Sequence, residues 1–290
     1  MRLNFLLYKS TINKMKIFIT GSNGFIGSHV VKKALNYGHE IVGLRRSNNL
    51  AKIELPFQPI WVDGTLEADM RQALEGCEAI IHLAAYGVNP NFDSWHEAFR
   101  WNVSASINLW SQAKQVGVKR FIIAGSCSEY GRSAERYKYL PCNAPLEPIG
   151  AYAASKAAAT LAAMAFAREN NLELAVLRPF HIFGEGESQE RLWPSLKKSA
   201  LAGEDFPMTF GEQIRDFTPV ELAAETFIHF ATEAIINKGE PAIHNIGTGR
   251  PMSIKSFAED QWKKFGATGK LKLGEIPYRK NEVMRYVPLV

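Results

Sequence analysis

Short apolar runs alternate along this chain with longer segments whose apolar residues recur at helical spacing. The apolar runs predict strands at Lys16–Ile19, Glu40–Leu44, Pro59–Val62, Ala79–Leu83, Lys119–Ala124 and Leu172–Leu177. The periodic segments predict helices at Phe25–Tyr37, Ser94–Val116 and Ala151–Asn170, and one more that ends near Gly76. Gly38 and Gly117 follow two of these helices, where glycine commonly ends a helix. Strands that alternate with helices predict a parallel, doubly wound α/β sheet.

The regular alternation ends near Arg178. Beyond it, prolines recur at positions 179, 194, 207, 219, 241 and 251, and proline interrupts both helices and inner strands. We therefore expect residues 15–178 to form the main domain. Residues 179–290 are expected to form mainly a smaller lobe, interleaved with the last elements of the main domain. Residues 1–14 precede the first strand and are expected to be an N-terminal extension, either from an upstream start or as a disordered tail.

Composition and charge narrow the class of protein. The 290 residues are 46% hydrophobic, which is enough for a large core. The net charge is +5, but Lys and Arg are scattered, so an anionic small molecule explains it as well as nucleic acid does, and no nucleic-acid partner is expected. Three cysteines without a CxxC spacing indicate reduced thiols in a cytoplasmic protein. No apolar run approaches the roughly 20 residues of a membrane span, and no metal site is predicted.

The string TGSNGFIG lies between the first strand and the first helix. Gly21 permits a tight turn, Gly24 lets the backbone approach a pyrophosphate, and Gly27 lets the helix pack closely on the sheet. The helix N-terminus then offers free N–H groups and the positive end of its dipole. The alternative is an ordinary strand-to-helix turn, which the spacing of three glycines disfavours. We expect a dinucleotide to be held here by Gly21, Asn23, Gly24, Phe25, Ile26 and Gly27.

The residues after the second strand indicate which dinucleotide binds. NAD sites usually have an Asp or Glu there, which binds the ribose hydroxyls, whereas this chain has Arg45, Arg46 and Ser47. Guanidinium groups bind phosphate through charge-assisted hydrogen bonds, so NADP is expected. NAD is the alternative, and so is a solvated basic turn with no ligand. Asp63 and Gly64 end the third strand near where an adenine would lie, although Asp-Gly is also a common turn.

The fourth strand ends in the string HLAA. Small residues there let the backbone lie against a cofactor, so Leu83, Ala84 and Ala85 are expected to contact it. His82 is expected to be a packed core histidine and no catalyst.

Tyr152 and Lys156 lie one helical turn apart in the string YAASK, so they share a helix face. The ammonium is expected to lower the pKa of the phenol and to hold the nicotinamide ribose, which leaves the phenol ready to act as an acid or a base. A YxxxK spacing also arises by chance, but seldom at the start of the helix after the fifth strand. Ser126, at the end of that strand, is the best candidate for a third catalytic residue, and Ser128 is second. Cys127 is expected to be a small packed residue.

Further strings follow in an order that points to one family: HLAA, WNVSASINLW, GSCSEYG, LRPFHIFGEGE, RDFTPVE and NIGTG. With the two strings above, they make the chain resemble the extended short-chain dehydrogenase/reductase family of nucleotide-sugar enzymes, from Met15 to the C-terminus. The resemblance implies a Rossmann fold, a nucleotide-sugar substrate and a cofactor contact by Asn102. It also implies that Arg215 holds the substrate pyrophosphate; the alternative is a surface salt bridge with Asp216. The substrate contacts it implies are Ser128, Glu129, His181 and Arg215.

Within that family the finer resemblance is to 4-ketoreductases of deoxysugar nucleotides, including enzymes that make CDP-abequose and dTDP-fucose types of product. Dehydratases of the family carry an acid–glutamate pattern after their catalytic Thr. Here Glu129 comes three residues after Ser126, one too many for that pattern, which argues against dehydration.

The predicted reaction is therefore NADPH-dependent reduction of a nucleotide-linked 4-keto-6-deoxysugar. A 4-epimerase with tightly bound NAD is the second hypothesis, and Arg45 and Arg46 count against it. A cofactor-sensing regulator without chemistry is the third, and the retained Tyr152–Lys156 pair counts against it.

The helices expected at Ser94–Val116 and Ala151–Asn170 are also predicted to form a two-fold, four-helix interface in a homodimer. Small residues on the second helix would permit close packing between subunits, although they could instead pack on the protein's own sheet. These residues are Ala157, Ala158, Ala162 and Ala163.

Overall fold

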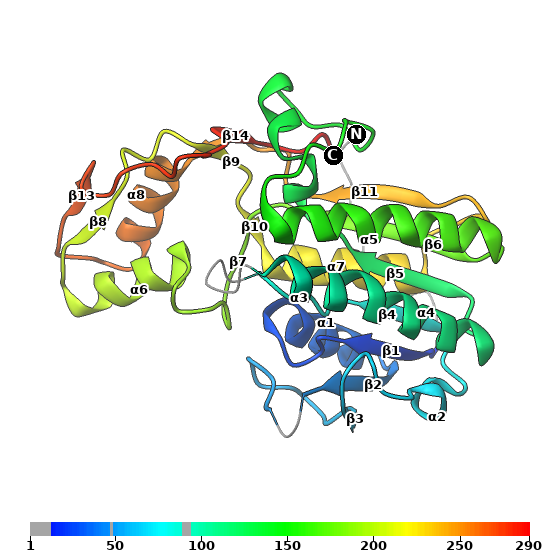
Figure 1. Ribbon diagram of the computed structural model, residues 1–290. Helices are drawn as coiled ribbons and strands as arrows, with labels where there is room; N and C mark the ends of the chain where they lie inside the picture. The colour runs from blue at the N-terminus through cyan, green and yellow to red at the C-terminus, as the bar shows by residue number, and fades with distance from the viewer. Residues whose placement is uncertain (1–12, 47–48, 89–93) are drawn as a thin grey trace.

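The computed structural model describes residues 13–46, 49–88 and 94–290. The predictions for residues 1–12 and for Ser47 lie outside the described residues. At the centre is a seven-stranded sheet with the order β11-β6-β5-β4-β1-β2-β3, in which every neighbouring pair is parallel (Figure 1). The predicted doubly wound sheet is thereby confirmed. Its strands are β1 (Lys16–Thr20), β2 (Glu40–Arg45), β3 (Ile60–Asp63), β4 (Ala79–His82), β5 (Arg120–Ala124), β6 (Glu173–Pro179) and β11 (Ala242–Ile246).

Helices cover both faces of this sheet. On one face, Val30 and Phe227 pack with Ile19 and Ile81 in one apolar cluster. On the other face, a second cluster joins Trp110 to the apolar residues of the strands. The helices of the first face are α1 (Phe25–Asn36) and α7 (Val220–Thr232), and those of the second are α2 (Arg71–Leu74), α4 (Ala105–Gln115) and α5 (Gly150–Glu169).

The strand order reverses at β1, because β2 and β4, its two neighbours, lead toward opposite edges of the sheet. In open parallel sheets, ligands bind outside the carboxyl ends of the strands at such a point. The glycine-rich turn follows β1, so the fold places it at this position.

The segment predicted as one helix, Ser94–Val116, contains an irregularity. It consists of α3 (Trp95–Phe99), a π-helical turn η1 (Arg100–Ser104) and α4. The Ser94 hydroxyl caps the first of these by accepting a hydrogen bond from the Glu97 backbone. Single π-helical turns are rare and often occur at functional sites, and this one contains the buried Asn102.

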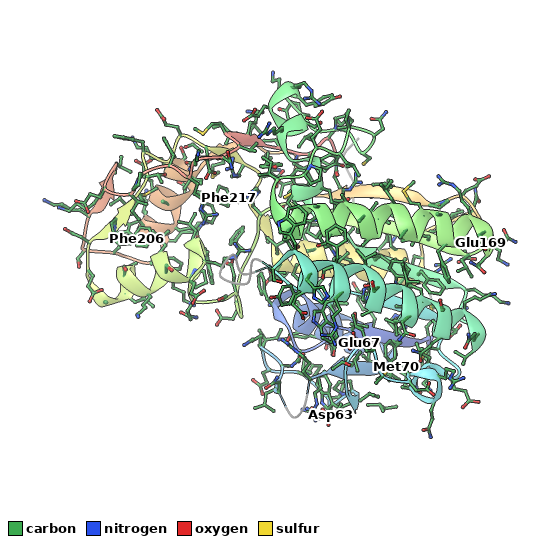
Figure 2. The ribbon with its side chains drawn as sticks, viewed as in Figure 1. Asp63, Glu67, Met70, Glu169, Phe206 and Phe217 are labelled. Carbon is green, nitrogen blue, oxygen red and sulfur yellow. The ribbon has the colours of Figure 1, made fainter. Side chains whose placement is uncertain are left out.

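After β6 the chain leaves the sheet and forms a smaller lobe, at the left of Figure 1. Leu196, Met208 and Trp262 belong to an apolar cluster of its own. Figure 2 marks Phe206 in this lobe and Glu169 at the far end of α5. The chain then returns to the main sheet through α7 and β11, so the two regions are interleaved in sequence. The elements of the lobe and its connections are β7 (Ile182–Phe183), α6 (Leu192–Ala202), β8 (Phe206–Met208), β9 (Ile214–Arg215), β10 (Thr218–Pro219), β12 (Met252–Ser253), α8 (Ile254–Lys264), β13 (Leu271–Leu273) and β14 (Arg285–Tyr286).

Candidate active site

The glycine-rich turn has the geometry that the sequence predicts. Gly21 has a φ of +64°, in the left-handed region, and its carbonyl accepts a hydrogen bond from the Gly24 N–H at 2.9 Å. A Cβ on Gly27 would lie 1.9 Å from the Gly21 oxygen, so a side chain cannot fit where α1 passes the turn. Among the described residues, no side chain caps the start of α1. The N–H groups of its first turn are therefore available to a phosphate.

Arg45 is held at the carboxyl end of β2. Its Nε donates to Asp63 Oδ1 at 2.8 Å, and its guanidinium lies 4.8 Å from the centre of the Trp61 ring. Arg46 is exposed. Arg45 and Asp63 thus place a guanidinium and a carboxylate side by side where the ribose of a dinucleotide is expected. Figure 2 marks Asp63 at this edge of the main sheet.

Thr20 connects β1 to the loop after β4. Its hydroxyl accepts hydrogen bonds from the N–H groups of Leu83 and Ala84, each at 3.1 Å, and bonds with His82 Nδ1 at 2.8 Å. The second ring nitrogen of His82 bonds with the Ser106 hydroxyl at 2.9 Å. Burial lowers the pKa of His82 to about 3, so the ring is neutral. The prediction of a core histidine is confirmed, and the backbone of the predicted Leu83–Ala85 segment lies beside the glycine-rich turn.

Asn102 joins that loop to α5. Its Oδ1 accepts from the Tyr86 N–H at 2.7 Å, and its Nδ2 donates to the Tyr86 carbonyl and to the Ser155 hydroxyl. Ser155 in turn donates to the Tyr152 carbonyl at 2.9 Å. Asn102 was expected to contact the cofactor; its polar atoms are used to hold the cofactor-side loop against the helix that carries Tyr152.

Ser126, Tyr152 and Lys156 meet at the carboxyl end of β5. The Tyr152 phenol is hydrogen-bonded to Ser126, and the buried Lys156 ammonium donates to the Ala124 carbonyl. Burial raises the pKa of Tyr152 to about 12, against the effect of the Ser126 hydrogen bond. The prediction that the ammonium lowers the pKa of the phenol is therefore wrong for this structure. The physical reason is that the phenol is desolvated, whereas the ammonium is bound to a carbonyl of β5.

Ser128 lies beside Ser126, and their hydroxyls are 2.6 Å apart. Glu129, by contrast, does not face outward as a substrate contact would; its side chain is fully buried. The segment Cys127–Tyr130 forms a 3-10 turn, η2, in which Ser126 and Glu129 make a capping box. That motif turns the Glu129 carboxylate back toward Ser126, so that the carboxylate accepts a hydrogen bond from the Ser126 N–H at 2.8 Å. The geometry thus favours a supporting role for Glu129.

His181 and Cys127 lie next to each other on the lobe side of the catalytic residues. The His181 backbone hydrogen-bonds with the Cys127 thiol, and burial raises the pKa of that thiol to about 11. Cys127 is thus a packed thiol, as predicted. The His181 ring lies between those of Phe217 and Tyr286, at 6.4 Å and 6.0 Å. Its Nδ1 is buried and has no hydrogen-bond partner among the described residues, which leaves one polar atom unused near the expected substrate phosphates.

Arg215 is buried and does not form the alternative salt bridge with Asp216. Its Nη2 donates to Glu282 Oε1 at 2.6 Å and to the Val283 carbonyl at 2.8 Å. The Asp216 carboxylate instead accepts hydrogen bonds from the Thr248 N–H and hydroxyl. The sequence reasoning missed Glu282, since its partner lies 67 residues away along the chain.

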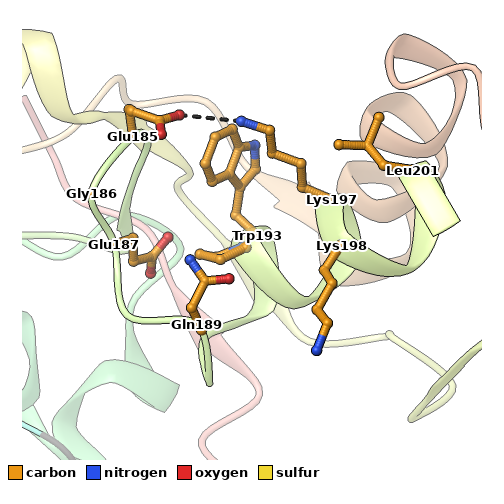
Figure 3. A pocket seen from close by; sticks show the side chains of 9 residues that line it. Glu185, Gly186, Glu187, Gln189, Trp193, Lys197, Lys198 and Leu201 are labelled. Atoms are coloured by element: carbon orange, nitrogen blue, oxygen red, sulfur yellow. Dashed lines mark hydrogen bonds and ion pairs between the residues drawn. The ribbon is translucent and has the colours of Figure 1, made fainter. Parts of the chain in front are cut away.

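Two further charged residues near the site were not predicted. Burial raises the pKa of Tyr152 and lowers that of His181, and the charge of Arg191 acts on both groups, in each case in the direction that lowers the pKa. Burial raises the pKa of Glu187 to about 7, and Arg191 opposes this. Glu187 lines a cavity of about 200 Å³ beside Trp193 (Figure 3). Both residues lie between β7 and α6, where no periodic pattern marks them.

A family model with the description "NAD dependent epimerase/dehydratase family" matches residues 17–247. The chain belongs to this family. The match covers the glycine-rich turn, the Tyr152–Lys156 pair and Arg215. In the described part of the chain, no helix is long and apolar enough to cross a membrane.

Relatives of the chain act on nucleotide sugars in several ways. A dTDP-6-deoxy-L-talose 4-dehydrogenase (NAD(+)) of Aggregatibacter actinomycetemcomitans is 27% identical over 93% of this chain and 98% of the relative. A trifunctional UDP-glucose 4,6-dehydratase/UDP-4-keto-6-deoxy-D-glucose 3,5-epimerase/UDP-4-keto-L-rhamnose-reductase of Arabidopsis thaliana is 30% identical over 89% of this chain, which spans 40% of that longer protein.

Solved structures agree with the fold. MoeE5 in complex with UDP-glucuronic acid and NAD is 27% identical, with a TM-score of 0.78 over 95% of this chain and 90% of that one. A UDP-N-acetylglucosamine 4-epimerase from Methanobrevibacter ruminantium M1 has a TM-score of 0.87 over 96% of this chain and 90% of that one, at 23% identity. The extended short-chain dehydrogenase/reductase resemblance is thereby confirmed.

Proposed function

We propose that this protein reduces a nucleotide-linked 4-keto-6-deoxysugar to the 4-hydroxy sugar, with NADPH as the reductant. The observation that carries the proposal is the half-buried Tyr152, whose phenol is desolvated and hydrogen-bonded to Ser126 at the carboxyl end of β5. With a pKa of about 12, the phenol keeps its proton at neutral pH. That is the state a proton donor to a carbonyl oxygen requires. Two relatives named for 4-keto reduction or 4-dehydrogenation support the same chemistry.

The residues present fit a dinucleotide. The pyrophosphate would be held by backbone N–H groups of the glycine-rich turn, and the nicotinamide ribose by Lys156, with Tyr152 alongside. When bound, the reduced nicotinamide supplies a hydride to the keto carbon. Negative charge then develops on the substrate oxygen, where Ser126 donates a hydrogen bond and Tyr152 delivers its proton. The Ala124 carbonyl keeps the Lys156 ammonium at the base of this arrangement.

The preference for NADP is assigned to Arg45 and Arg46. Arg45 is fixed by Asp63 and by the face of Trp61, with its remaining N–H groups beside the expected ribose. A 2′-phosphate would gain charge-assisted hydrogen bonds from these groups. The negative charge of Asp63 repels the same phosphate. The preference for NADP is therefore the attraction by Arg45 less the repulsion by Asp63.

The substrate diphosphate is assigned to Arg215, with His181 Nδ1 as a further polar contact. Arg215 is already paired with Glu282, which holds the guanidinium in one orientation. The positive charge of Arg191 also acts on His181. These residues and the basic net charge agree with an anionic substrate.

A nucleotide-sugar 4-epimerase is the second candidate, and one observation favours it. The charge of Arg45 is neutralised by Asp63, which weakens the case for a 2′-phosphate. The related MoeE5 holds NAD beside UDP-glucuronic acid. An epimerase would have to remove a hydride first and would need Tyr152 as a base, which its raised pKa disfavours.

One assay separates the two functions. The purified protein is mixed with NADPH or NADH and a panel of 4-keto-6-deoxy nucleotide sugars, and the loss of absorbance at the reduced nicotinamide band is followed. A ketoreductase consumes one reduced cofactor for each sugar. If no 4-keto sugar consumes cofactor, while a UDP-hexose is interconverted with its 4-epimer without added cofactor, the reductase proposal is wrong and the epimerase holds.

A further inference from the structure

Glu129 occupies an unusual position for a carboxylate. Its side chain is 0% exposed, yet both of its oxygens are hydrogen-bonded. Oε1 accepts from the Ser126 N–H at 2.8 Å. Oε2 accepts from Arg178 Nε at 2.8 Å and from the Thr160 hydroxyl at 3.0 Å. Glu129 therefore connects the catalytic strand end to α5 and β6.

Gly125 makes room for this carboxylate directly beneath the end of β5. A Cβ on Gly125 would lie 2.6 Å from Glu129 Oε1 and 2.9 Å from Arg178 Cγ. Both are closer than carbon atoms approach other heavy atoms in folded proteins. The absence of a side chain at this position thus lets the ion pair pass under the strand, between the residue that binds Lys156 (Ala124) and the residue that binds Tyr152 (Ser126).

Arg178 is fixed in turn. Its Nη1 donates to the Tyr130 hydroxyl at 2.9 Å and to the Cys142 carbonyl at 3.0 Å. Tyr130 donates to Asn245 of β11 at 2.7 Å. The carboxylate is therefore held by a guanidinium whose own position is set by three other segments of the chain.

Glu129 also acts on the Lys156 ammonium through its charge, while burial raises the pKa of the Glu129 carboxyl itself and the charges of Arg178 and Lys156 oppose that rise. Burial lowers the pKa of Lys156, and the charge of Glu129 opposes that effect. The other ionisable groups that interact electrostatically with the carboxylate are Arg178 on β6, Tyr152 on α5 and Tyr130 on its own turn, and the charge of Lys156 also acts on His82 of β4. Glu129 is the acidic group among them.

We propose that Glu129 is a positioning residue for the catalytic Ser126–Tyr152–Lys156 group: one oxygen fixes the Ser126 backbone, the other is bound to Thr160 on the helix that carries Tyr152 and Lys156, and its negative charge favours the ammonium form of Lys156. Of the two measurements below, only that of turnover rests on the proposed reduction; the unfolding measurement does not. The family resemblance had placed Glu129 among the substrate contacts; the buried ion pair gives it a different task, exerted from behind the site.

Removing one partner of a buried ion pair leaves the other charge uncompensated and can prevent folding. The main test variant is therefore the double change Glu129→Gln with Arg178→Gln, which removes both charges and keeps hydrogen-bonding side chains. Glu129→Asp keeps the charge and shortens its reach. Thr160→Val is the matched control, since it removes one hydrogen bond of the same cluster and leaves both charges in place.

The first readout needs no substrate. A lysine whose pKa is lowered on folding makes the protein gain stability as pH rises, because the unfolded state holds more protons. Without Glu129 the pKa of Lys156 falls further. In urea unfolding between about pH 7 and about pH 10, the unfolding free energy of the double variant should therefore rise more steeply with pH than that of the wild type. The difference in slope should correspond to at most about one additional proton taken up on unfolding. Thr160→Val and Glu129→Asp should keep the wild-type slope.

The second readout is turnover with NADPH and dTDP-4-keto-6-deoxyglucose. Glu129→Asp should lower kcat by about tenfold to 100-fold, because a displaced Ser126 misaligns the reacting groups, and the Kd for NADPH should change far less. An unchanged slope in the double variant, or wild-type kcat in Glu129→Asp, overturns the proposal. If the wild type reduces no 4-keto sugar, the proposed function fails, and the unfolding slopes still decide the role of Glu129.

Discussion

Arg45 and Asp63 form an ion pair across the carboxyl ends of β2 and β3, with 2.8 Å between Nε and Oδ1. The two residues are directly paired in the register of the strands. A dinucleotide with its ribose at this edge meets both a group that attracts a 2′-phosphate and one that repels it. We therefore expect this pair to decide the balance between NADP and NAD.

Asp63→Asn should shift that balance toward NADPH. The amide keeps the shape and a hydrogen-bond acceptor for Arg45, but removes the negative charge. We expect about a tenfold tighter Kd for NADPH, corresponding to roughly 1.4 kcal/mol, with the Kd for NADH little changed. Titration of intrinsic fluorescence with each cofactor measures both values. Arg45→Ala is the opposite control and should weaken NADPH binding; a Kd for NADPH that neither change alters would show that this pair does not meet the 2′-phosphate.

Substitutions at two glycines of the turn, Gly24 and Gly27, should affect cofactor binding and folding to different extents. A Cβ on Gly27 would lie 1.9 Å from the Gly21 oxygen, whereas a Cβ on Gly24 would lie 3.1 Å from it. Gly27→Ala should therefore cost roughly 1–3 kcal/mol of unfolding free energy or more. Gly24→Ala should keep most of the stability and still weaken cofactor binding, because its methyl group stands where the backbone approaches the pyrophosphate. Urea unfolding and cofactor titration of both variants test the contrast; equal losses of stability would contradict it.

The homodimer stays a prediction, and the burial of the alanines on which the sequence based it can be examined. Ala157 and Ala163 are buried within the subunit, so for these two the alternative of packing inside the protein holds. Exposed apolar side chains on the same helices remain: Leu161 is 60% and Ile107 37% exposed. These residues could form the centre of a two-fold interface.

Leu161→Glu should dissociate that dimer, because a charge placed at the centre of an apolar interface is costly to bury. Light scattering at micromolar concentration measures the mass of wild type and variant. Ile235→Glu is the matched control, since Ile235 is 95% exposed and lies outside these helices. A wild type that is monomeric, or a Leu161→Glu variant that stays dimeric, rules out this interface.

The sequence predicted the sheet well because its signals are local. Each inner strand is a short apolar run, and Gly27 is needed because a side chain there would meet the Gly21 carbonyl, six residues earlier in the chain. The capping box at Ser126 and Glu129 is also a local signal, since S-x-x-E is a motif within one turn. The π-helical turn at Asn102 was not readable, because it is stabilised by partners on other segments, Tyr86 and Ser155. The pairing of Arg215 with Glu282 depends in the same way on the tertiary fold.

The catalytic assignment is tested most directly at Tyr152. Tyr152→Phe removes the proton donor and keeps the ring, so turnover should fall by at least about 100-fold, the lower range for a positioned acid. The Kd for NADPH should change little. Tyr37→Phe is the matched control: it also removes a phenol, one that bonds with Glu225 far from the site, and should leave turnover intact.

The pH dependence of the wild type adds a second check on the same residue. Because the pKa of the Tyr152 phenol is raised to about 12, the proton-donating form persists from neutral pH to well above 9. Reduction of a 4-keto nucleotide sugar should therefore show no loss of kcat through ionisation of this group below about pH 10. The reverse oxidation needs the phenolate, so its rate should rise with pH over the same range. Single-turnover hydride transfer, followed by nicotinamide absorbance in both directions, measures this. Near-normal transfer in Tyr152→Phe, or a wild-type reduction rate that already falls between about pH 7 and about pH 9, would show that another group supplies the proton.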